Sequence, residues 1–108
     1  MNRYRKGEIY DVAPDDGDSR PYRVVIVSSD EWNQGVAPQC VEIVRLHNER
    51  EIPPYLILLH EEADSMRGLA IMDSLSPVPT LSMIEQVGMV GGVTLSKLDD
   101  ALRKVYAI

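Results

Sequence analysis

Cysteine and histidine are scarce in this 108-residue chain, which has one cysteine and two histidines. A single cysteine forms no internal disulfide and builds no structural metal site by itself, so packing must supply the stability. We expect Cys40 to be a buried core thiol. No stretch approaches the ~20 apolar residues of a membrane span, and the polar opening lacks the apolar run of a signal peptide. These absences predict a cytoplasmic protein with no membrane partner.

Basic residues are also few, because 11 Lys and Arg stand against 17 Asp and Glu, for a formal charge of −6. This balance argues against a general nucleic-acid binder, which needs basic side chains to replace counterions at phosphates. A local basic site remains possible, since Arg20 and Arg23 are close in sequence, as are Arg45 and Arg50. If these segments meet in space, they form a basic groove on an acidic protein. The alternative is that these charges are scattered on a solvated surface.

The hydrophobic content of 44% suits one compact core, and we expect residues 1–108 to form a single domain. Short β-type runs dominate, without the long 3.6-residue periodicity of a helix bundle. The run of four β-branched residues at 24–27 is typical of a strand buried on both faces. The expected strands cover residues 7–12, 22–27, 41–46, 55–59, 68–73 and 80–87, with a bend at 76–79.

One segment is clearly helical, and it comes last. Ser96 is a candidate N-cap with Asp99 as a capping-box acid, and Leu98, Leu102 and Val105 follow helical spacing. Ser28 and Ser29 are candidate caps for a short turn around residues 32 and 33. The pattern predicts a mainly β (α+β) domain, a small curled sheet or barrel with a C-terminal helix.

Four stretches of the sequence carry a family resemblance through their order along the chain. They are an Arg-Lys-Gly-Glu-Ile-Tyr start at 5–10, and Arg20-Pro21 before a hydrophobic strand with Asn33 beyond it. The other two are Gly-Leu-Ala-Ile-Met-Asp-Ser-Leu at 68–75, and Gly-Val-Thr-Leu-Ser at 92–96 leading into a helix. In this order they resemble the MazF/PemK family of bacterial toxins, and the resemblance implies an SH3-like β-barrel of about five to seven strands with a C-terminal helix. It also implies a homodimeric toxin that arrests growth as a sequence-selective endoribonuclease on single-stranded RNA, needs no metal or cofactor, and is silenced by a peptide segment of its antitoxin.

The resemblance places catalysis at the arginine of the Arg-Pro motif, which is Arg20 here, and at the end of the third strand. At that second place the family usually carries Thr-Ser, whereas this chain has His47 or Asn48. Metal-free RNA cleavage needs a proton acceptor, a proton donor and a cation for the phosphorane. Arg20 suits the cation, although a surface arginine leading into a strand is the plain alternative. An unperturbed imidazole titrates near ~6.5, so His47 suits proton transfer, or is simply a loop residue.

We interpret five further residues as RNA-binding: Arg23, Asn33, Arg45, Asn48 and Arg50. Trp32 is either a base-stacking platform or a core or interface anchor. The run at 60–62 reads as a solvated loop rather than a metal cluster, and the glycine pair at 91–92 as a tight turn.

Two other functions stay open at this point. CcdB-like toxins have a barrel similar to that of the MazF/PemK family but poison DNA gyrase by binding it. The altered catalytic position in this chain is compatible with such a binding function. A catalytically inactive module of the same fold, which keeps its groove for an antitoxin-like peptide, is the third possibility.

Overall fold

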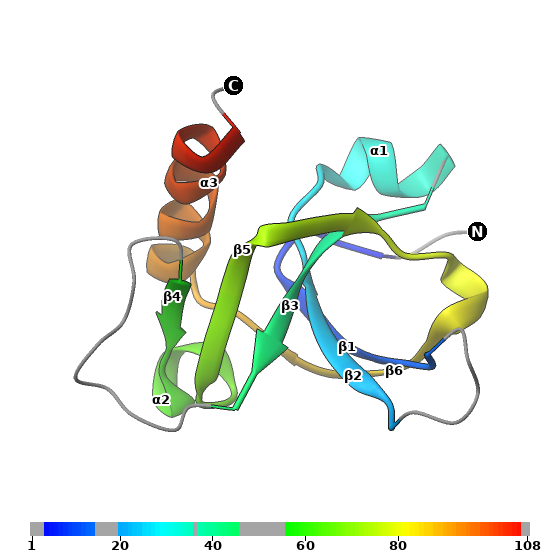
Figure 1. The fold of residues 1–108 in the computed structure, drawn as a ribbon, viewed down its shortest axis with the longest axis horizontal. Coiled ribbons are helices and arrows are strands. Elements are labelled where there is room, and N and C mark those ends of the chain that lie inside the picture. Colours follow the sequence, from blue (N-terminus) through cyan, green and yellow to red (C-terminus); the bar gives the residue numbers. More distant parts are fainter. Residues whose placement is uncertain (1–3, 15–19, 36, 46–55, 107–108) are drawn as a thin grey trace.

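The computed structural model describes residues 4–14, 20–35, 37–45 and 56–106. Within these residues the chain forms six strands, three α-helices and one 3-10 turn (Figure 1). Their bounds are β1 Glu8–Val12, β2 Tyr22–Ile26, α1 Asp30–Gly35, β3 Gln39–Val44, β4 Leu56–Leu59, α2 Glu61–Asp64, β5 Gly68–Pro77, η1 Thr80–Ser82, β6 Met83–Met89 and α3 Gly92–Tyr106.

The six strands form one antiparallel sheet in the order β4-β5-β3-β2-β1-β6. The sheet curls, and the long strand β5 bends (Figure 1) near the place where its register on β3 shifts, between Cys40 and Glu42. In the described part of the chain β4 and β6 are the two edges, so the barrel-like sheet is not closed. The prediction of a mainly β domain of five to seven strands with a C-terminal helix is confirmed.

Both faces of β2 are covered, as its β-branched run predicted. The register places Ile9, Val25 and Val41 side by side on one face, where they join a core that includes Leu98 and Leu102 of α3. The opposite face carries a second core. Its buried members are Val12, Val24, Ile26, Cys40 and Val78.

Two titratable groups near the second core stay neutral at physiological pH. Cys40 is 1% exposed, as expected, and burial raises the pKa of its thiol to about 12. Burial, followed by the Glu8 carboxylate and Tyr4, raises the pKa of Tyr10 to about 12 as well. Neither group is therefore a source of acid–base chemistry at neutral pH.

Several element boundaries differ from those predicted. Strand β5 extends into the bend expected at 76–79 and ends at Pro77. The run at 60–62, expected to be a loop, instead contains the start of the short helix α2. Trp32 lies on α1 and is 50% exposed, so it is not a core residue. Ser29 caps that helix as predicted, because its Oγ accepts a hydrogen bond from the Trp32 backbone N–H at 3.2 Å. No helix in the described residues is long and apolar enough to cross a membrane.

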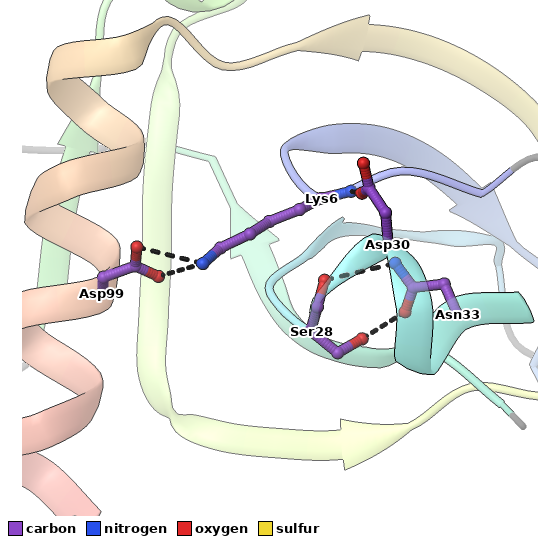
Figure 2. Close-up of polar contacts among 5 residues, drawn as sticks. All are labelled: Lys6, Ser28, Asp30, Asn33 and Asp99. Carbon is purple, nitrogen blue, oxygen red and sulfur yellow. Dashed lines mark hydrogen bonds and ion pairs between the residues drawn. The ribbon is translucent and has the colours of Figure 1, made fainter.

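The C-terminal helix begins at Gly92, four residues before the predicted N-cap Ser96. Asp99, the predicted capping-box acid, instead pairs with Lys6, whose Nζ lies 2.8 Å from Asp99 Oδ1 (Figure 2). The true start of α3 is fixed by a residue that is distant in sequence, Asp64.

Asp64 ties α2 to the junction of β6 and α3. Its carboxylate is 0% exposed and accepts three hydrogen bonds, from His60 N at 2.8 Å, Gly91 N at 2.8 Å and Thr94 Oγ1 at 2.9 Å. Gly91 is required there, because an added Cβ would lie 2.8 Å from the carbonyl oxygen of Ala63. These contacts hold α2 against the junction of β6 and α3.

The next residue, Ser65, strengthens the same attachment. It has a left-handed backbone (φ 68°), and its Oγ both donates to Met89 O and accepts from Met89 N at 3.1 Å. The residues that follow α2 therefore leave it from a fixed position.

We predict that Asp64→Asn lowers the free energy of unfolding by about 2–4 kcal/mol, because an amide NH₂ must then face a buried donor. Urea unfolding followed by circular dichroism measures the loss. Asp73→Asn, at an exposed position of β5, is the matched control and should stay within about 0.5 kcal/mol of the parent. Equal unfolding midpoints for the two variants would show that the Asp64 contacts contribute little.

Candidate functional site

A groove of about 490 Å³ lies where β1 and β3 end, β2 begins and the link from α2 enters β5. These segments are far apart in sequence, so the groove exists only in the folded sheet. The residues that line it are Asp11, Pro21, Tyr22, Arg23, Glu42, Ile43, Val44, Arg45, Met66 and Arg67.

Arg23 is held in this groove by two contacts. The β1–β2 register sets it directly opposite Asp11, so the two side chains project from the same face of the sheet. Its Nε donates to Asp11 Oδ1 at 2.9 Å, and its Nη1 lies 3.6 Å from Met66 Sδ. Because a guanidinium carries five N–H groups, these contacts orient the fork and leave donors for a ligand. The side chain keeps 42% of its surface exposed, so a ligand has access to it.

Two more of the predicted arginines lie at or beside the groove. Arg45 is exposed and lines it, one residue beyond the end of β3. Arg20 is exposed and directly precedes Pro21, which lines the groove at the start of β2. The structure thus gathers the basic residues of two segments around one site, as the basic-groove hypothesis requires.

Three predicted site residues, His47, Asn48 and Arg50, lie outside the described residues. In the sequence they follow Arg45 by two, three and five positions. Their roles stay predictions.

Arg67 also lines the groove, and sequence reasoning missed it. The family-like stretch starts one residue later, at Gly68, so attention fell on the strand and not on the residue before it. The available signal was a basic residue immediately before a strand, close to the arrangement at Arg20, which precedes β2 by two positions. With Met66, Arg67 forms the wall that the link between α2 and β5 supplies.

Asn33 lies at the opposite end of β2 and β3 from the groove. These strands begin or end at the groove and connect through α1, and the five residues of β2 alone rise about 16 Å. Asn33 is 0% exposed, its Nδ2 donates to Ser28 O at 3.2 Å, and its Oδ1 accepts from Ser28 Oγ (Figure 2). Its side chain therefore holds α1 onto the sheet and is too deeply buried to contact RNA.

The charge of the groove differs from that of the protein. Three arginines face two carboxylates, Asp11 and Glu42, so the groove is locally positive on a chain of formal charge −6. Among the described residues, no group of three or more His, Cys, Asp or Glu side chains is placed to hold a metal ion. An anion that presents two oxygens side by side, as a phosphodiester does with its two non-bridging oxygens, can accept two parallel hydrogen bonds from a guanidinium.

No protein-family model and no curated protein matches the sequence. Solved structures match its fold over nearly the whole chain. An endoribonuclease from a mycobacterial species, in complex with its cognate antitoxin, has 20% identity over 98% of this chain and 97% of that one, with a TM-score of 0.77. A MazE–MazF structure from Deinococcus radiodurans has 12% identity, covers 97% of each chain and has a TM-score of 0.79.

A third match is the toxin MazF-mt6 from Mycobacterium tuberculosis, with 11% identity over 94% of this chain and 97% of that one, and a TM-score of 0.74. The chain therefore has the MazF fold, and the resemblance seen in the sequence is confirmed at the level of fold.

Proposed function

We propose that this protein is the toxin of a toxin–antitoxin pair and acts in the cytoplasm as a metal-independent, sequence-selective endoribonuclease on single-stranded RNA. The observation that carries the proposal is the arginine groove, with Arg23 oriented by Asp11, in a fold shared with a mycobacterial endoribonuclease and with MazF.

The reaction needs only groups that side chains provide. The ribose 2′-oxygen attacks the adjacent phosphorus while a base takes its proton, and the bond from phosphorus to the 5′-oxygen breaks as an acid protonates that oxygen. The products are a 2′,3′-cyclic phosphate and a 5′-hydroxyl. Negative charge builds on the phosphorane, so a fixed cation lowers the barrier.

Arg20 and Arg23 supply that cation in our proposal. Arg20 is exposed beside the groove and Arg23 is already oriented, so together they grip the scissile phosphate from the start of β2. His47 is the proposed proton-transfer group, because it is two positions beyond Arg45 in the sequence. Arg45, Asn48 and Arg50 hold the neighbouring phosphates.

We predict that the purified protein cuts a mixed single-stranded RNA in EDTA at discrete sites, and that Arg20→Ala and Arg23→Ala each slow cutting about a hundredfold or more. End-labelled fragments on a gel measure the rates.

His47→Ala should flatten the pH–rate profile between about 5.5 and 7.5, where an unperturbed imidazole titrates.

Arg103→Ala, at an exposed position on α3, removes the same charge away from the groove and should cut at the parent rate. A strict requirement for a divalent metal would end the metal-independent mechanism. Absence of cutting by folded protein would instead favour the gyrase-directed or peptide-binding alternatives.

We further propose that the protein pairs with an antitoxin segment and forms a homodimer. The mycobacterial neighbour is in complex with its cognate antitoxin, which supports the first part. Exposed apolar side chains on η1 and the edge strand β6 support the second, since Leu81 is 99%, Ile84 54% and Met89 48% exposed. Apolar residues on a strand edge are typical of a covered surface.

Light scattering after size exclusion should give twice the chain mass of 12.1 kDa. The double variant Leu81→Glu with Ile84→Glu should run as a monomer, because charge repels across such a contact. Val93→Glu, on a residue 74% exposed at the start of α3, is the control and should stay dimeric. A monomeric parent protein would contradict the homodimer.

A further inference from the structure

A second hollow of about 410 Å³ shares a wall with the groove. Its lining consists of Leu58, His60, Glu61, Glu62 and Arg67, and Arg67 lines the groove as well. The two hollows are therefore neighbours, separated by the Arg67 side chain.

The chemistry of the second hollow is unlike that of the groove. Glu61 and Glu62 are exposed and bring two carboxylates, Leu58 is half-buried and apolar, and His60 is an exposed flat ring. Two carboxylates repel a phosphate. They accept hydrogen bonds from the N–H groups of a base, while an apolar surface and an imidazole stack on its faces.

This hollow is also held in place before any ligand binds. His60 N donates to the buried Asp64, and Ser65 is tied to Met89, so both ends of α2 are attached to the rest of the fold. The backbone that carries Glu61 and Glu62 is therefore fixed at both ends, which limits the positions that the two carboxylates can reach.

We propose that this second hollow is a base pocket for guanine, next to the scissile phosphate, with Arg67 contacting the phosphate that joins the two nucleotides. The proposal rests on the ribonuclease function above. Guanine presents adjacent N1–H and N2–H donors, which match the two oxygens of one carboxylate. Adenine, cytosine and uracil each place a hydrogen-bond acceptor beside their donor, and that acceptor would face the carboxylate.

The test measures binding, so it does not depend on cleavage. Fluorescein-labelled hexamers of 2′-O-methyl RNA, which lacks the attacking hydroxyl, are titrated with the full-length protein and followed by anisotropy. The set comprises oligo-U and oligo-U with one G, A, C or inosine at each position. Inosine keeps N1–H but lacks the N2 amino group. The difference in affinity between G and inosine therefore measures the contribution of the N2–H hydrogen bond.

We expect one position at which G binds about tenfold or more tightly than the other natural bases, with inosine intermediate. In the double variant Glu61→Gln with Glu62→Gln, that preference should fall to about twofold or less, while affinity for oligo-U stays equal or rises as two negative charges are lost. Glu85→Gln, at an exposed position on β6, is the control and keeps the preference.

Arg67→Gln should weaken every hexamer by a similar factor and leave the base preference intact, because a phosphate contact carries no sequence information. Arg103→Gln is its charge-matched control. Circular dichroism and thermal unfolding confirm that each variant is folded before it is scored.

The outcomes separate the two proposals. Binding of oligo-U with no preference for G, or a preference that survives in the double glutamine variant, overturns the guanine pocket and leaves the ribonuclease proposal standing. Failure of the parent protein to bind any hexamer overturns both.

Discussion

The buried carboxylate of Asp64 is the contact on which the arrangement of this protein depends. It accepts hydrogen bonds from the residue before α2, from the glycine before α3 and from the first turn of α3, and so joins two parts of the chain that are about thirty residues apart. Met66 and Arg67 follow directly, and both line the groove. The buried carboxylate of Asp64 thereby helps to set the position of one wall of the groove.

The opposite wall depends on strand register. Pairing of β1 with β2 sets Asp11 beside Arg23, and a shift of β2 by one residue would turn Arg23 to the other face of the sheet, away from Asp11. This register explains how a protein with a formal charge of −6 keeps a positive groove. Arg23, Arg45 and Arg67 are concentrated there by the meeting of three segments.

The sequence predicted features that depend on local pattern. The β-branched run identified β2 and its burial on both faces, and the segments containing Arg20, Arg23 and Arg45 do meet. Features that depend on distant contacts were missed. The start of α3 is set by Asp64, Arg67 gains its place from the attachment of α2, and Asn33 proved to be a buried support for α1. No local pattern carries that information.

Single-stranded RNA is proposed to bind in the groove where β1 and β3 end and β2 begins. This binding is tested most directly by NMR titration of the ¹⁵N-labelled protein with a 2′-O-methyl RNA hexamer. We expect the largest amide shift changes on residues lining the groove, on both sides, at Tyr22, Arg23, Arg45 and Arg67. Changes concentrated on α1 or α3, with the groove amides unmoved, would contradict it.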